Sequence, residues 1–247
     1  MEAIYVFHEA CLYDARNISL AAVQVNSFFS NRAPKLKEIT IYHSDLQGFS
    51  SCLRSLENIQ KLTAFRSSLR EEDLTHISEM PNLKSLVLHD NFIYYYDLTK
   101  ASYTLKSFMK NLNGKKLQCF VLSNCKGFDE SAFEELSKQY FPELEALYIG
   151  QQLVVENPEV IINRIIQNCP RLNHINLKGG FSYIPNSFLL DILKDFNVRI
   201  TIEGKVLSNG KKYISKKKSF EDFLKKHDYQ LFEKYKEMEQ QSKWLAK

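Results

Sequence analysis

The sequence lacks the features that mark a membrane protein or a secreted precursor. No run of about 18 apolar residues occurs, so we expect no transmembrane helix. The first residues, Met1 to Tyr5, have neither a basic region nor a long apolar stretch, so a Sec-type signal peptide is not expected. These absences predict a cytoplasmic protein.

The sequence also lacks the spacings that disulfide, metal and nucleotide sites need. The cysteines are odd in number and form no C-x-x-C pair, which favours reduced thiols. They are Cys11, Cys52, Cys119, Cys125 and Cys169. No His or Cys lies at metal-ligand spacing, and no phosphate-binding motif surrounds Gly179-Gly180 or Asn209-Gly210. We expect no metal, no cofactor and no catalytic residues.

Acidic and basic residues nearly balance along the chain, except near the C-terminus. The formal net charge is +4, but residues 205–247 contain 12 Lys and 6 acidic residues. The rest of the chain is therefore slightly acidic. Glutamates and aspartates alternate with lysines in 219–247, which weakens a reading as a phosphate-binding or lipid-binding segment.

What the sequence does contain is an internal repeat. Four of the six prolines stand two residues before a leucine that opens an L-x-x-L-x-L run. These leucines are Leu36, Leu83, Leu144 and Leu172, and Ile59 and Leu117 open two copies without the proline. The copies start 23, 24, 34, 27 and 28 residues apart. A repeat of this length predicts stacked strand–turn–helix units.

Helix-start signals follow the predicted strands. Ser68-x-x-Glu71 has the form of a capping box, Asp129 precedes an apolar helical pattern, and Asn157-Pro158 places proline at a first helical position. The strand 198–202 is expected to end the sheet. We predict three regions: a first repeat or N-terminal cap (1–33), repeats with an insertion near 94–113 (34–204), and a basic linker with one amphipathic helix over 219–245 (205–247).

The pattern resembles the leucine-rich repeat family, and most closely the cysteine-containing repeats of F-box/leucine-rich-repeat adaptors within the ribonuclease-inhibitor-like superfamily. The run from Leu117 to Asp129 matches L-x-x-L-x-L-x-x-C-x-x-I-T/D, and Cys169-Pro170-Arg171-Leu172 matches the C-P-x-L start of a repeat. The resemblance implies an α/β solenoid with a curved parallel sheet inside and helices outside. The sequence shows no F-box-like segment before the repeats, so direct recruitment of a ubiquitin ligase is not expected unless such a segment has been removed.

In such a repeat the residues that alternate with the leucines face the concave side. One column of these residues, the first position of each strand, is expected to be Ala3, Glu38, Lys61, Ser85, Cys119, Ala146, His174 and Arg199. The N-terminal half then exposes large aromatic side chains together, which is typical of a binding surface. The candidate partner-binding residues are Tyr5, Phe7, Tyr42, Phe65, Val87, His89, Val121 and Tyr148, with Tyr94, Tyr95 and Tyr96 in the longest unit. The alternative is that the C-terminal helix or the insertion covers this face.

These observations predict a monomeric, non-enzymatic module that binds a protein on its concave face. An adaptor role of the ubiquitin-ligase kind is one setting. A bacterial effector acting in a host cytosol is another, since the richness in Lys, Asn, Ile, Phe and Tyr is typical of an AT-rich genome. The rival hypothesis is binding of nucleic acid or an anionic membrane through the basic tail. The C-terminal helix could also cap the last repeat or bind a partner itself.

Overall fold

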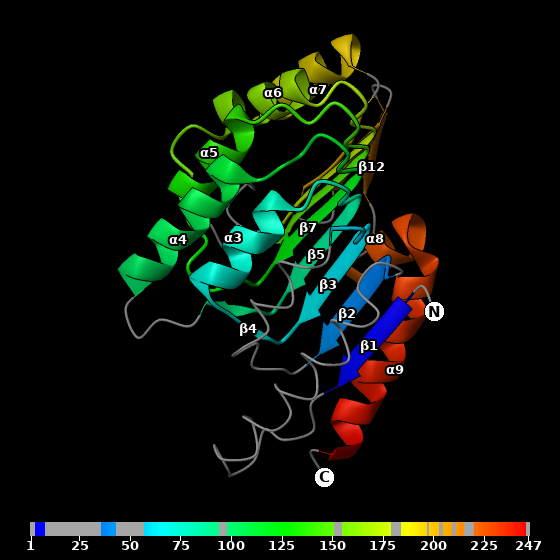
Figure 1. Ribbon diagram of the computed structural model, residues 1–247. Coiled ribbons are helices and arrows are strands. Elements are labelled where there is room, and N and C mark those ends of the chain that lie inside the picture. The colour runs from blue at the N-terminus through cyan, green and yellow to red at the C-terminus, as the bar shows by residue number, and fades with distance from the viewer. Residues whose placement is uncertain are drawn as a thin grey trace.

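A computed structural model describes residues 3–7, 36–42, 57–93, 98–150, 155–178, 184–196, 198–202, 205–208, 211–214 and 220–245. Strands and helices alternate through most of it (Figure 1). The strands of the main sheet are β1 (Ala3–Phe7), β2 (Glu38–Tyr42), β3 (Lys61–Phe65), β5 (Ser85–His89), β7 (Cys119–Ser123), β8 (Ala146–Gly150), β9 (His174–Lys178), β10 (Arg199–Ile202), β11 (Lys205–Ser208) and β12 (Lys211–Ile214). Two short strands, β4 (Ser68–Leu69) and β6 (Phe92–Ile93), pair separately.

The main sheet follows chain order from β1 to β12. Neighbours from β1 to β10 are parallel, and β11 and β12 add to β10 as an antiparallel extension. The expectation that the strand near 198–202 ends the sheet is therefore wrong. A parallel edge strand presents unpaired backbone groups, and here β11 pairs with them. Part of the basic stretch, 211–214, is thus a strand rather than a linker.

The parallel strands share one register, so equivalent repeat positions stand side by side. The column of first residues predicted from the sequence is confirmed: Ala3, Glu38, Lys61, Ser85, Cys119, Ala146, His174 and Arg199. Second and fourth strand positions, such as Leu86 and Leu88, point into the core beneath the helices. Third and fifth positions point to the other face, as the two-residue period of a strand requires.

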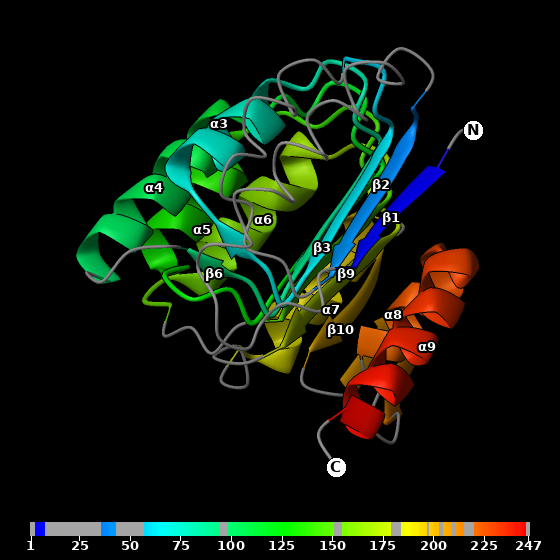
Figure 2. The same cartoon turned by 60° about the horizontal axis from the view of Figure 1, so that its bottom comes forward.

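One face of the sheet is covered by a layer of helices (Figure 2). These are α3 (Glu71–Glu79), α4 (Leu98–Asn111), α5 (Glu130–Lys138), α6 (Pro158–Asn168) and α7 (Asn186–Asp195). Helices α3 to α6 pack on one another in chain order. Helix α4 belongs to this layer although it lies within the predicted insertion near 94–113, so its residues form the helix of their own unit.

The turns after the strands repeat as well. Arg66, Asp90 and Asn124 each follow a strand directly and have φ near +50°, which turns the chain sharply out of the sheet. Two residues after the strand, the Asn91 amide donates to the Ala64 carbonyl and accepts from the Ser67 N–H, both at 2.9 Å. In the next unit the Cys125 thiol approaches the Leu88 carbonyl at 3.5 Å. The buried Cys125 thiol thus packs in the turn and bonds to backbone carbonyls.

The predicted helix starts are correct in two cases out of three. Asp129 caps α5 by accepting from the Ala132 N–H at 3.0 Å, and α6 begins at Pro158. The capping box at Ser68 and Glu71 is wrong. Ser68 lies in β4, and α3 is capped instead by Asp73, whose carboxylate accepts from the Arg70 N–H at 2.8 Å. An acidic residue at the third helical position performs this task because it reaches back to the N-cap backbone.

The C-terminal segment forms two helices rather than the single long one predicted. Helix α8 (Phe220–His227) and helix α9 (Tyr229–Leu245) meet at Asp228. The Asp228 carboxylate accepts from the Leu231 N–H at 3.0 Å, so it caps the second helix. The break lets both apolar stripes face the sheet. Figures 1 and 2 show this helix pair on the sheet face opposite α3 to α6.

No helix within the described ranges has both the length and the apolar character needed to cross a membrane.

Candidate partner-binding face

The face opposite the helix layer is lined by large apolar and aromatic side chains. Phe65, Val87, His89, Val121 and Tyr148 come from β3, β5, β7 and β8 and alternate with the core positions. We call these five residues the aromatic face. All are at most 7% exposed, because α8 and α9 lie on them. The alternative in which the C-terminal segment covers the face is therefore the arrangement observed.

The other candidate residues are placed only in part. The register sets Tyr5 opposite Thr40, Phe7 opposite Tyr42, and Tyr42 opposite Phe65. These three therefore share strand positions three and five with the aromatic face. Tyr94, Tyr95 and Tyr96 lie outside the described residues.

Helix α8 crosses the aromatic face from one strand end to the other. Phe220 stacks on the imidazole of His89, with ring centroids 4.1 Å apart and planes 2° from parallel. Phe223, one turn on, makes edge contacts with Tyr148 at 5.1 Å and a tilted contact with His174 at 5.2 Å. Because His89 ends β5 and His174 begins β9, α8 runs antiparallel to the strands. Such aromatic pairs contribute beyond the area they bury.

Helix α9 turns back over the strands nearer the N-terminus. Leu231 lies beside β2 and β3, where it lines a small cavity with Thr40 and Thr63. Four residues further on, the Tyr235 ring contacts Phe65 at 5.3 Å and Phe220 at 5.3 Å. Phe65 and His89 thus each contact both helices, through Phe220 of α8 and Tyr235 of α9.

The contact between the helix pair and the sheet forms an apolar cluster that is separate from the main core. The helix pair contributes Phe220, Phe223, Leu224, Leu231 and Phe232, and the sheet contributes Phe65, Val87, Val121, Ala146 and Tyr148. The larger cluster lies on the other side of the sheet, beneath α3 to α7. The two clusters share only the sheet between them, so the helix pair packs as a layer added to a complete core.

Gly150 makes room for Tyr148 on this face. A Cβ at Gly150 would lie 2.5 Å from the Tyr148 ring and 2.7 Å from the Ser123 hydroxyl. Burial raises the pKa of Tyr148 to about 12, partly offset by its hydrogen bond with Ser123. The phenol therefore stays protonated and can act as a fixed hydrogen-bonding group under an apolar surface.

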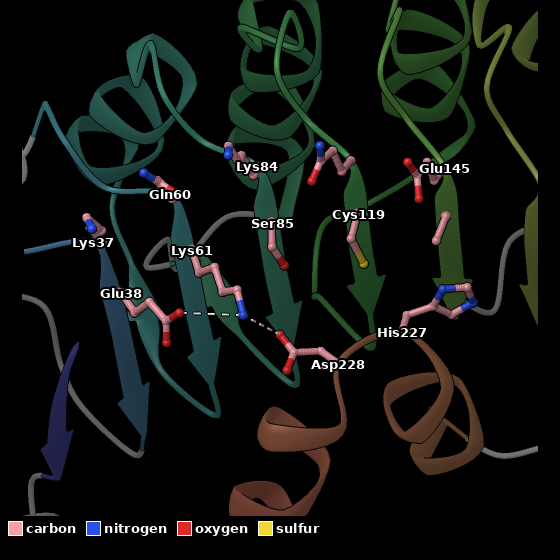
Figure 3. A pocket seen from close by; sticks show the side chains of 12 residues that line it. Lys37, Glu38, Gln60, Lys61, Lys84, Ser85, Cys119, Glu145, His227 and Asp228 are labelled. Carbon is pink, nitrogen blue, oxygen red and sulfur yellow. Dashed lines mark hydrogen bonds and ion pairs between the residues drawn. The ribbon is translucent and has the colours of Figure 1, made fainter. Parts of the chain in front are cut away.

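A hollow of about 400 Å³ lies at the amino ends of the strands, where α8 meets α9. Figure 3 shows the Lys61 ammonium between two carboxylates: Asp228 at 3.3 Å and Glu38 at 3.5 Å. Burial opposes the charge on Lys61, but the two carboxylates outweigh it and raise its pKa. The Asp228 side chain is only 15% exposed, so this ion pair fixes the helix junction to β3.

The junction has a second polar contact, to β9. The Nε2 atom of His227 lies 2.6 Å from the Nδ1 atom of His174, whose Nε2 faces the Thr201 hydroxyl at 3.4 Å. One proton bridges the two rings, so the contact requires an unprotonated acceptor. Burial lowers the pKa of His227 to about 4, and the charges of Lys226 and Arg199 act in the same direction. The bridge is therefore intact at neutral pH.

The carboxyl ends of the strands carry a row of charged and polar side chains. Asp90 lies 3.3 Å from His89 Nε2 and 3.6 Å from Arg66, and it accepts from Asn124 at 2.8 Å. Burial opposes ionisation of Asp90, but His89, Asn124 and Arg66 outweigh it and lower its pKa to about 2. This row holds the His89 ring in the plane on which Phe220 stacks.

The described thiols are held in the protonated form by burial. Burial raises the pKa of Cys119, Cys125 and Cys169 to about 12, so each stays a thiol at neutral pH. Within the described part of the chain, no group of three or more His, Cys, Asp or Glu side chains converges on a point where a metal ion could bind.

Two parts of the site were missed by the sequence reasoning. Lys61 and His174 stood in the first predicted column, but only the fold brings them to Asp228 and His227. The signal for the junction was present as Asp228-x-x-Leu231, a helix-start pattern inside an apparently continuous helical period.

Comparison with known proteins gives little beyond this geometry. No protein-family profile matches the sequence, and no curated protein is significantly similar to it. One solved structure that superposes on the chain is a structural genomics target from Bacteroides fragilis, with 13% sequence identity and a TM-score of 0.43. The match covers 86% of this chain and 66% of that one, so this chain spans slightly less than two thirds of that protein's length. A likeness at this level carries no functional implication.

Proposed function

We propose that the chain is a non-enzymatic protein-interaction module that binds a partner on the aromatic face, in place of the α8–α9 pair. The observation that carries the proposal is the seating of an amphipathic helix pair on that face through a separate apolar cluster. A sheet face that accepts an amphipathic helix from its own chain has the shape and polarity to accept one from another chain.

The repeat architecture supports the same proposal. The shared register and the repeated backbone bonds of Asn91 and Cys125 are in keeping with the leucine-rich repeat resemblance. Proteins built from such units use the strand face opposite their helices for binding. The adaptor setting rests on the sequence resemblance, and the effector setting rests on the resemblance together with the amino-acid composition.

The test is a selection of peptides from a displayed library of random amphipathic helices. The baits are the full-length chain and its Phe223→Ala variant, in which the helix pair is loosened but the aromatic face is unchanged. We expect the variant to enrich helical peptides that compete with a synthetic peptide of residues 219–245. Peptides that bind both baits equally, or that do not compete, would place the binding site elsewhere.

The basic-tail hypothesis is tested beside it. Binding of phosphatidylserine vesicles or of single-stranded DNA should fall steeply with salt if the tail is the site. We expect neither probe to compete with the selected peptides. Competition by vesicles or DNA would favour the tail over the aromatic face.

A further inference from the structure

The contacts at the junction between α8 and α9 indicate which chemical groups a partner of the aromatic face needs. Apolar contacts hold most of the helix pair, but Asp228 makes the ion pair that joins the junction to the sheet, with its carboxylate 3.3 Å from the Lys61 ammonium. Apolar contacts alone do not fix which way a helix lies on a flat sheet, whereas a charge pair at one end does.

Lys61 is placed to bind a negatively charged group. It stands at the first position of β3, at the edge of the aromatic face, and its side chain is 39% exposed. Glu38 lies 3.5 Å away on β2 and holds the ammonium toward the hollow. If α8 and α9 leave, Lys61 and Glu38 remain on the sheet, and the place of the Asp228 carboxylate becomes free for another anion.

The same carboxylate caps a helix. Asp228 accepts from the Leu231 N–H, and Leu231 and Phe232 are the first apolar residues of α9 to reach the face. Asp228 therefore provides both the helix cap and the negative charge, and the apolar residues that anchor α9 follow it by three and four residues. On the other side, Phe223 and Leu224 precede Asp228 by five and four residues. The charge stands between two apolar anchors that lie on the same face.

We infer that the partner is an amphipathic helical segment with an aspartate or glutamate at a helix start, three residues before an apolar pair, and that its carboxylate binds Lys61 where Asp228 now does. This inference rests on the proposed function of the aromatic face. The helix pair is then an internal copy of the ligand, and Lys61 determines the direction in which a ligand lies.

A charge exchange between peptide and protein tests it. The probes are two labelled peptides of residues 219–232, one with the natural sequence and one with Asp228→Lys. The proteins are the full-length Phe223→Ala variant with and without Lys61→Glu. The readout is the ratio of the two peptides' affinities on each protein. Any change in how often the chain's own helix pair opens affects both peptides equally and cancels in this ratio.

We expect the natural peptide to bind about fivefold more tightly than the Asp228→Lys peptide when Lys61 is present, the upper range for a partly exposed ion pair. Lys61→Glu should reverse the preference. Binding of both peptides with a ratio near one on both proteins would overturn the inference and leave the proposed function standing. Failure of both peptides to bind either protein would overturn both.

Discussion

Phe223→Ala should release the helix pair from the aromatic face while the rest of the fold stays intact. Phe223 is 1% exposed and packs against Tyr148, His174 and His227, so the substitution leaves a cavity at the centre of the contact. Truncating a buried phenylalanine costs about 3–5 kcal/mol. Nearly all of this cost falls on the contact between α8 and the sheet, because the core beneath α3 to α7 does not include Phe223.

The size of the effect follows from that cost. Since about 1.4 kcal/mol is a factor of ten, the population with the helix pair undocked should rise by about a hundredfold to a few thousandfold. Amide hydrogen exchange measures this population residue by residue. We expect exchange over 220–240 to accelerate by at least about a hundredfold, and exchange in β7 and β8 to stay unchanged.

A matched control distinguishes local release from general damage. Tyr103→Ala removes an aromatic side chain from α4 that is 70% exposed, and it should alter neither segment. Acceleration of β7 and β8 together with α8 in the Phe223→Ala variant would show that the helix pair and the sheet unfold as one unit. That result would refute the separation of the two clusters.

Three further outcomes are expected. At neutral pH, iodoacetamide should leave Cys119 and Cys125 unmodified in the natural chain, and in Phe223→Ala it should modify Cys119 first, as mass spectrometry of the peptides would show. Exchange over α8 and α9 should accelerate as the pH falls from about 7 toward 4, after correction for intrinsic exchange. Docked His227 has a pKa of about 4 against 6.5 when free, so the undocked form binds more protons and docking is favoured at high pH; solvent screening keeps the change below tenfold per pH unit. Asn91→Ala should lower the free energy of unfolding by about 2–4 kcal/mol in urea titrations because it removes one hydrogen bond to a buried N–H and one to a buried carbonyl, while the exposed control Asn111→Ala should lower it by under about 0.5 kcal/mol.

Much of the sheet follows from the sequence alone. The L-x-x-L-x-L runs set the strand positions, and their common spacing sets a common register, so the column from Ala3 to Arg199 was predicted residue by residue. Leu62, Leu86 and Phe120 occupy equivalent core positions for this reason. Local periodicity is sufficient here because each strand pairs with the strand of the preceding unit.

The covering of the aromatic face could not be derived in the same way. The alternation predicts that Phe65 and Tyr148 leave the core side, but it does not say what meets them there. The contact between Phe220 and His89 joins residues 131 positions apart, and no repeat relates them. Local pattern reasoning has no access to such a contact.

Two errors have a local physical cause. The helical period across 219–245 continues through Asp228, and the period concealed a capping residue that ends one helix and starts the next. At α3, Ser68 and Glu71 fit the capping pattern, but the helix begins two residues later than that pattern requires, so the N-cap is Arg70 and the acid at the third helical position is Asp73. In both cases a single aspartate decided the boundary.

The most direct test of the central claim compares two numbers for the same pair of proteins. One is the gain in affinity for a selected helical peptide when Phe223→Ala replaces the natural full-length chain. The other is the gain in the undocked population measured by hydrogen exchange. If the helix pair and the peptide compete for the aromatic face, the two gains are equal until the undocked form predominates. Equal affinity of both proteins for the peptide, despite a large gain in the undocked population, would contradict the account.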